Sequence, residues 1–398
     1  MTGPAAPVDL DVDALLDDPS RRIILCCGSG GVGKTTTSAA VALRAAERGR
    51  KVVVLTIDPA RRLAQSMGIE TLDNTPRPVP GVVSTSSTTK GGSLDAMMLD
   101  MKRTFDDVVR SGASPEKAEQ VLKNPFYVAV SSSFAGTQEY MAMEKLGQLD
   151  QDARATGRWD LIVVDTPPSR SALDFLDAPE RLSSFLDGRL SKLLLAPARG
   201  PARLMTAGFG FVTHTLSKIL GAQMLQDVQA FVAALDTLFG GFRARAQRTF
   251  ELLQDSRTAF LVIAAPEPDA LREAAYFVER LREERMPLAG LVVNRATLAP
   301  PTSAGATTLS ANAAMAGVEK LRASGEDHGL SAGLLRLHAD RVLVVEREKR
   351  LTARFAAGHP GVPTVVLPAL STDVHDLDGL RRIGELLADA RGARRQQG

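Results

Sequence analysis

The sequence predicts an α/β protein with a doubly wound, mostly parallel sheet, and three observations support this class. Several segments of strand length are apolar at every position, which is typical of strands buried on both faces. Segments with apolar residues at helical spacing alternate with them. A glycine-rich loop joins the first such strand to the first such helix. With 398 residues, 44% of them hydrophobic and 24% charged, the chain can bury a large core.

The elements follow one another in a regular order. The expected strands and helices are a strand at 21–27, a helix at 35–49 ending at Gly49, strands at 51–58 and 159–165, a strand at 259–266, a charged helix at roughly 268–285, strands at 288–294 and 362–368, and a closing helix at about 376–391. The strands at 51–58 and 159–165 end in Asp58 and Asp165. Ligands of such sheets bind at the carboxyl ends of the strands, so both aspartates are candidates for a site.

The domain boundaries follow from where this rhythm breaks. We expect an N-terminal tail at 1–20, one domain over 21–392 and a C-terminal tail at 393–398. Two long tracts, at about 95–150 and 178–255, have helical spacing and are expected to form a helical subdomain. The segment 297–333 begins rich in Pro, Ser, Thr and Ala and is expected to be mobile. The pattern at 338–355 fits strand or helix, and the flanking charges favour helix.

Composition narrows the possible functions. A net charge of +2 gives no reason to expect binding to nucleic acid, and no apolar stretch approaches the ~20 residues that would insert stably in a membrane. The acidic N-terminus is no signal peptide, so a cytoplasmic protein is expected. Cys26 and Cys27 are adjacent in a predicted strand, and the five histidines form no ligand-spaced cluster. A disulfide framework and a zinc site are therefore not expected.

The motif GSGGVGKT at 28–35 predicts a phosphate-binding loop. Its glycines allow backbone N–H groups to face the phosphates, and the helix that follows adds its N-terminal dipole. Lys34 supplies a charge at the β- and γ-phosphates, and Thr35 offers a hydroxyl to magnesium. Nucleotide binding as a complex with Mg²⁺ is predicted for Gly28, Ser29, Gly30, Gly31, Val32, Gly33, Lys34, Thr35 and Thr36.

The two strand-end aspartates fit the chemistry of phosphoryl transfer, which needs a positioned magnesium and an aligned water. Asp165 stands where a Walker B carboxylate belongs, so with Thr35 it is the expected magnesium ligand. Asp58 is a second acid at the same sheet edge. Either aspartate alone could instead be a helix cap. The pair beside a phosphate loop favours the catalytic interpretation.

Four motifs in order, SGGVGKTT, TIDPARRLAQSMG, VDTPPSRSALDFL and LVVN, resemble the arsenite-pump and tail-anchored-protein-targeting ATPases, a family with a deviant Walker A loop, over about 20–390. The resemblance implies a dimeric ATPase in which Asp58 orients the attacking water and, with Lys34, is catalytic. It places Asp165, Thr166, Pro167 and Pro168 in switch II, with Arg170 following. It also implies that Asn294 reads adenine and that Pro368 lies in the loop covering the base.

Departures from the family pattern shape the expected partners. A lysine usually stands at the position of Ser29 and reaches the partner's phosphates, so a homodimer of this chain would lack it. We therefore expect a heterodimer with a paralogous subunit that has the lysine. The rival is a homodimer using another cation such as Arg170, although the sequence favours a surface role for that arginine. The chain has no Cys-x-x-Cys pair for zinc and no dispersed cysteines for a metalloid.

The helical tracts suggest what the nucleotide controls. The apolar stripe at 216–239 fits either internal packing or a nucleotide-gated groove for a hydrophobic client helix. The main alternative is a positioning ATPase of the ParA/MinD type acting on DNA or membrane, against which the short basic tail and the long insertions argue. A further alternative is the catalytic subunit of an arsenite or anion pump, against which the cysteine positions argue.

Overall fold

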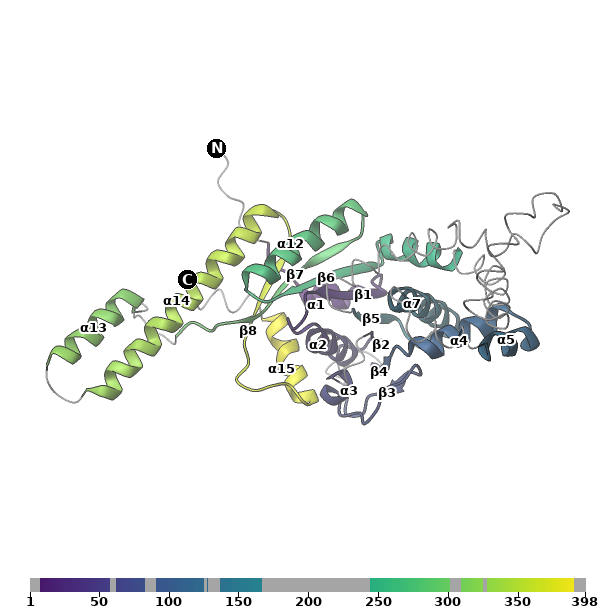
Figure 1. Cartoon of the computed structure of the whole chain (residues 1–398), viewed down its shortest axis with the longest axis horizontal. Coiled ribbons are helices and arrows are strands. Elements are labelled where there is room, and N and C mark those ends of the chain that lie inside the picture. The colour runs from purple at the N-terminus through teal and green to yellow at the C-terminus, as the bar shows by residue number, and fades with distance from the viewer. Residues whose placement is uncertain are drawn as a thin grey trace, which may run out of the picture.

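The computed structural model describes residues 8–57, 62–82, 91–124, 127, 137–166, 244–300, 309–324 and 328–389. Within them the chain forms an eight-stranded sheet in the order β3-β4-β2-β5-β1-β6-β7-β8 (Figure 1). Every pair of neighbours is parallel except β3 and β4, which are antiparallel. The mostly parallel sheet with helices confirms the predicted α/β fold class.

The six predicted strands lie close to their predicted positions, and β3 and β4 are additional strands. Their bounds are β1 Ile23–Gly28, β2 Lys51–Thr56, β3 Arg77–Pro78, β4 Ser93–Met98, β5 Leu161–Asp165, β6 Thr258–Ala264, β7 Leu288–Ala296 and β8 Thr364–Pro368. The three central strands β5, β1 and β6 are buried at every position, which explains their unalternated apolar sequences.

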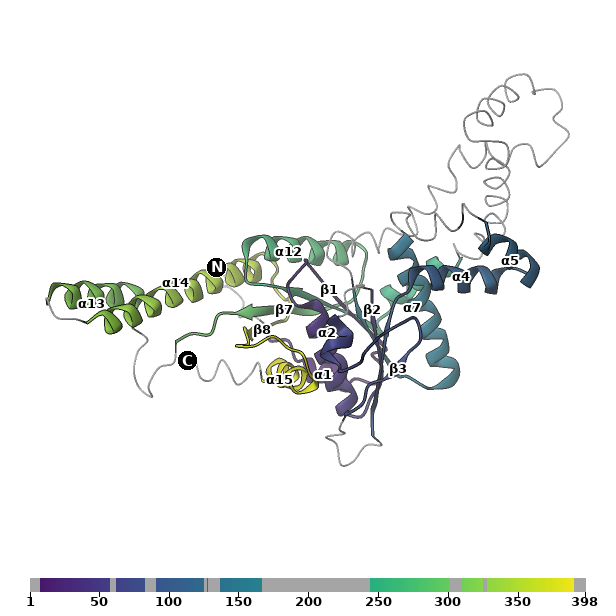
Figure 2. The same cartoon turned by 60° about the horizontal axis from the view of Figure 1, so that its bottom comes forward.

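Helices cover both faces of this sheet. Their bounds are α1 Val12–Asp17, α2 Lys34–Glu47, α3 Arg62–Ser66, α4 Met101–Gly112, α5 Pro115–Leu122, α7 Thr137–Thr156, α12 Pro268–Glu283, α13 Ala311–Ala323, α14 Gly329–Gly358 and α15 Leu377–Ala388. Helices α2 and α15 pack together on one face, and α12 lies on the other (Figures 1 and 2). Among these helices none is long and apolar enough to cross a membrane.

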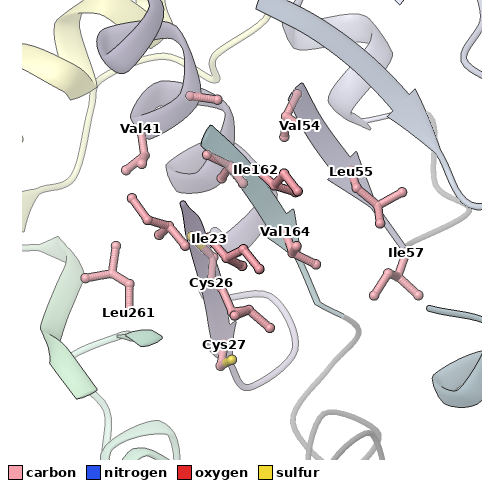
Figure 3. Packing of buried hydrophobic residues seen from close by; sticks show 14 of the residues in the cluster. Ile23, Cys26, Cys27, Val41, Val54, Leu55, Ile57, Ile162, Val164 and Leu261 are labelled. Atoms are coloured by element: carbon pink, nitrogen blue, oxygen red, sulfur yellow. The ribbon is translucent and has the colours of Figure 1, made fainter. Parts of the chain in front are cut away.

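The core lies where the central strands meet α2. Figure 3 shows Cys26 and Cys27 among side chains such as Val41, Ile162 and Val164. Both thiols are free and buried. Burial raises the pKa of the Cys27 thiol to about 12 and that of Cys26 well above its ordinary value. The two cysteines therefore behave as small hydrophobic residues of the core.

The predicted N-terminal tail at 1–20 is wrong for residues 8–20, which belong to the domain. Asp9 forms a parallel bridge with Thr364 beside β8. Leu16 of α1 is fully buried. Asp13 of α1 accepts hydrogen bonds from the Arg44 guanidinium of α2 at 2.6 and 2.7 Å. The acidic side chains of this segment pair with Arg44 of α2 and with Arg48 directly after it, which only the fold brings close.

The helical tract predicted at about 95–150 begins on a strand instead. Residues 93–98 form β4, and the buried Asp95 within it explains why the strand was missed. The Asp95 carboxylate accepts a 2.8 Å bond from the Trp159 indole and bonds of 3.1 and 2.8 Å from Arg158. The rest of the tract contains α4, α5 and α7. Of the tract at 178–255, only the helical residues 244–254 are described, and the stripe at 216–239 lies outside the described residues.

The segment 297–333 also differs from its expectation. It contains α13 and the start of α14, and α14 confirms the helix predicted at 338–355. Ala311 and Ala314 of α13 pack against Ala339 and Val342 of α14. Alanine is the strongest helix former, and a face of small residues lets the two helices approach closely. Residues 301–308, which hold most of the Pro, Ser and Thr that suggested mobility, lie outside the described residues.

Candidate nucleotide-binding site

The loop between β1 and α2 has the backbone that a phosphate loop needs. Gly31 and Gly33 have φ angles of 79° and 91°, which L-residues with side chains rarely adopt. A Cβ on Gly28 would lie 2.0 Å from the carbonyl oxygen of Ile263 in β6. Helix α2 begins at Lys34 with Gly33 as its N-cap, so the N-terminal N–H groups of the helix face the loop.

Lys34 and Ser29 are linked across the loop. The Lys34 ammonium donates a 2.9 Å hydrogen bond to the Ser29 carbonyl oxygen, which holds the lysine over the loop. The Ser29 hydroxyl is buried and has no hydrogen-bond partner in the described part of the chain. At this position the side chain therefore points into the protein, and its short length keeps it there.

Three oxygen atoms meet at the carboxyl ends of β2 and β5. Asp165 ends β5, where it pairs in register with Cys26 of β1 and Thr56 of β2. Its Oδ2 atom accepts hydrogen bonds from the Thr35 hydroxyl at 2.7 Å and from the Thr56 hydroxyl at 2.9 Å. A hydroxyl and a carboxylate are the hard oxygen donors that Mg²⁺ prefers, so Thr35 and Asp165 fit a magnesium–nucleotide complex.

The remaining switch residues are only partly visible. Thr166 follows Asp165, and its hydroxyl donates a 2.9 Å bond to the Cys26 carbonyl oxygen. Asp58, Pro167, Pro168 and Arg170 lie outside the described residues, so their predicted roles stay predictions. Within the described residues, no group of three or more His, Cys, Asp or Glu side chains could hold a metal ion.

The end of β7 contacts the phosphate loop from the opposite side. The Asn294 amide donates a 2.8 Å bond to the Val32 carbonyl oxygen. The Arg295 guanidinium donates a 2.8 Å bond to the Gly31 carbonyl oxygen. Arg295 also has a φ of 62°, a left-handed conformation uncommon for a residue with a side chain and enriched at functional sites.

One cavity of about 880 Å³ joins the phosphate loop to the ends of β7 and β8. It is lined by Gly30, Gly31, Gly33, Lys34, Thr35, Thr36, Gln65, Ser66, Thr166, Asn294, Arg295, Leu367, Pro368, Ala369, Leu370, Thr372, Asp373, Val374, His375, Ile383 and Leu386. Asn294 and Pro368 thus share a cavity with the loop, and Gly28, Ser29, Val32 and Asp165 are not among its lining residues. Its volume is within the range of small-molecule sites.

Sequence reasoning missed two residues of this site. Thr56 is the last residue of β2, and its only sequence signal was a hydroxyl two residues before Asp58. Arg295 directly follows Asn294 and could have been noticed as a cation at a strand end. Neither was distinctive, because the contacts of both depend on loops far away in the sequence.

A glycine-rich loop between a strand and a helix, with a lysine, a threonine and a strand-end aspartate behind it, defines a P-loop nucleotide-binding protein. Comparison narrows the class. The model of the anion-transporting ATPase family matches residues 21–316. The chain belongs to this family and is an ATPase.

Three similar proteins agree with the assignment of this chain to an ATPase family. The chain is similar to "ATPase GET3B" of Arabidopsis thaliana, at 24% identity over 74% of this chain and 68% of that protein. It is similar to "ATPase GET3" of Podospora anserina, at 27% identity over 73% of this chain and 78% of that protein. The "Arsenical pump-driving ATPase" of Escherichia coli is 32% identical over 40% of this chain and 26% of that protein.

Proposed function

We propose that this chain is one subunit of a dimeric ATPase whose nucleotide state controls the binding of a hydrophobic client or partner protein. The observation that best supports the nucleotide-binding part of this proposal is the cavity that joins the phosphate loop to Asn294 and Pro368. A triphosphate placed on the N–H groups of the loop leaves the base directed toward the ends of β7 and β8. Asn294 is then the group that reads adenine, and Pro368 covers the ring.

Lys34, Thr35 and Asp165 act on the phosphates in this proposal. Lys34 exchanges its bond to the Ser29 carbonyl for the β- and γ-phosphate oxygens. Thr35 and Asp165 would hold magnesium, which would neutralise charge on the phosphates. Thr56 keeps the Asp165 carboxylate oriented through its 2.9 Å bond.

Asp58 is the proposed catalytic carboxylate. It lies two residues beyond Thr56, whose hydroxyl is already at the Asp165 carboxylate. A carboxylate near this point would orient water toward the γ-phosphate and would not be needed to hold the nucleotide. The Asp58→Asn variant should therefore bind Mg-ATP with unchanged affinity and fail to hydrolyse it.

The proposed dimer pairs this chain with a paralogous subunit. A trans cation that stabilises charge on the leaving phosphoryl group is worth roughly 10³–10⁵ in rate. Ser29 cannot supply one, since its hydroxyl is uncharged and buried. A subunit that carries a lysine at this position would complete the site of this chain. The client surface would lie on α4, α5 and α7 together with the tract at 178–255.

Turnover measurements test the proposal. The expected result is slow ATP hydrolysis by the purified chain alone, faster hydrolysis when a paralogue is added, and loss of the mixed activity in Asp58→Asn. The Ser29→Lys variant should raise the rate of the chain alone if the dimer can form from one subunit type. Fast hydrolysis by the unmodified chain alone, unchanged by Arg170→Ala, would contradict the trans-cation argument. Failure of Mg-ATP to bind would contradict the site itself.

A further inference from the structure

Helices α13 and α14 form an arm, here defined as residues 309–324 and 328–358. The arm projects from the sheet at the end of the molecule opposite α4 and α5 (Figures 1 and 2). Of the eleven large hydrophobic side chains exposed in the described residues, seven lie on it: Leu309, Met315, Leu330, Leu334, Leu337, Leu343 and Val344. Exposed apolar side chains gathered on one element indicate a binding surface.

Four of these side chains form a leucine stripe, defined as Leu330, Leu334, Leu337 and Val344. Their exposed fractions are 79%, 58%, 64% and 43%. The spacings of four, three and seven residues fit the 3.5-residue repeat of a coiled-coil seam. The stripe is not the face that packs on α13, which consists of Ala339 and Val342 with Leu335 beside them. Helix α14 therefore has two apolar faces, and α13 covers one.

A polar residue interrupts the stripe. Arg341 occupies the seam position between Leu337 and Val344, and it is exposed. A single polar residue at such a position favours partners that provide a complementary group. The Arg341 Nε atom donates a 2.8 Å bond to the Leu298 carbonyl oxygen. A guanidinium has further N–H donors, and these are available to a carboxylate.

A second copy of this chain is a poor occupant of the stripe. In a parallel pairing Arg341 would face Arg341 of the copy. In an antiparallel pairing that stacks Leu334 on Val344, Arg341 would face Leu337 of the copy. The parallel pairing opposes like charges, and the antiparallel pairing desolvates a guanidinium without a carboxylate, and both are unfavourable.

The net positive charge of the arm favours an acidic partner. Helix α14 has six basic and three acidic side chains. The exposed Arg336, Arg347 and Arg354 are spaced 11 and 7 residues apart, so they lie in a line along one side of the helix. We propose that the leucine stripe binds one amphipathic helix of another protein, with a 3.5-residue apolar repeat, acidic flanks and a carboxylate facing Arg341.

Two features set the character of this contact. The stripe runs from Leu330 to Val344, and its two ends are about 21 Å apart along the helix axis. The contact is therefore smaller than a standard stable interface and should be reversible. The arm is also fixed at its base, because Glu348 accepts bonds from the N–H and the hydroxyl of Thr297 at 2.7 and 2.8 Å. A preorganised surface loses little entropy on binding. The proposal does not depend on the proposed function of the nucleotide site.

Synthetic helices test the proposal with the full-length chain. The acidic probe is a fluorescein-labelled peptide of four heptads with Leu at a and d, Glu at e and g, and one central Glu at a; the basic probe has Lys at every Glu position. By fluorescence anisotropy, the acidic probe should bind at least about tenfold more tightly than the basic probe. Leu334→Glu should weaken acidic-probe binding at least about tenfold. Arg341→Glu should shift the preference toward the basic probe.

Tyr276→Glu on α12 is the matched control, because Tyr276 is 59% exposed and lies outside the arm. It should leave binding unchanged, and all variants should keep the parent melting temperature because the substituted side chains are exposed. Three results would overturn the proposal. They are absence of acidic-probe binding at about 100 μM, binding that Leu334→Glu does not weaken, and stripe-dependent self-association or flotation with phosphatidylserine vesicles in place of probe binding.

Discussion

Replacing Gly33 with alanine should disturb base recognition as well as phosphate binding. The substitution strains a backbone with φ of 91°, at a cost of about 1–2 kcal/mol. Its Cβ would also lie 2.3 Å from the Asn294 amide nitrogen, which therefore must move. The Asn294 bond to the Val32 carbonyl oxygen is then lost, at a further cost of about 0.5–1.5 kcal/mol. Since Asn294 is the proposed adenine-reading group, its displacement should reduce selectivity for ATP.

Gly31→Ala provides the matched control. Gly31 has a φ of 79°, but its Cβ would meet nothing within 4 Å. Both variants should lose melting temperature and bind nucleotide more weakly. Only Gly33→Ala should lower the ratio of GTP to ATP dissociation constants, by roughly three- to tenfold, in competition titrations against a fluorescent nucleotide. An unchanged ratio in Gly33→Ala, or an equal fall in Gly31→Ala, would refute the role given to Asn294.

Further predictions concern the other groups of the site and the core. Lys34→Ala should weaken Mg-ATP binding about ten- to a hundredfold by isothermal titration, because a charge-assisted phosphate contact is lost. Arg295→Gly should weaken it about two- to twelvefold through loss of the bond to Gly31, whereas Arg285→Gly, at a second left-handed arginine (φ 56°), should not. Thr56→Val should raise the magnesium concentration for half-maximal turnover, since the Asp165 carboxylate loses one of its donors; an unchanged requirement would contradict this role. The pKa of the Cys27 thiol is raised from 9.0 to about 12, so the unfolded chain loses this proton at lower pH than the folded chain does. The free energy of unfolding of the parent, measured in urea relative to Cys27→Ala, should therefore be constant below pH 9 and fall between pH 9 and 12.

The fold class was predictable because its signals are local and periodic. Strands buried on both faces have continuous apolar runs, as residues 161–164 and 259–264 do, and this pattern needs no knowledge of the partners. The phosphate loop was equally clear, because eight consecutive residues build it. Strand β4 was missed because Asp95 interrupts its apolar run, and Arg158 and Trp159, which satisfy that carboxylate, come more than 60 residues later.

The candidate site likewise contains residues that local motifs predict and residues whose roles depend on distant contacts. Lys34 and Thr35 follow from the motif, and Asp165 from its place at a strand end. The contacts of Asn294 with Val32 and of Arg295 with Gly31 join residues more than 260 positions apart, so no local pattern reports them. The role of Thr56 likewise depends on the parallel register that aligns it with Asp165.

The sequence by itself determined the sheet, the phosphate loop and the family, since each is encoded in short contiguous stretches with a defined period or spacing. Only the tertiary structure decided which loops share the nucleotide cavity, that residues 8–20 are packed, and that α14 presents a second, uncovered apolar face. The physical reason is that burial and hydrogen bonding are properties of pairs. A leucine at helical spacing has the same sequence signal whether another helix covers it, as α13 covers Leu335, or leaves it in solvent, as at Leu334.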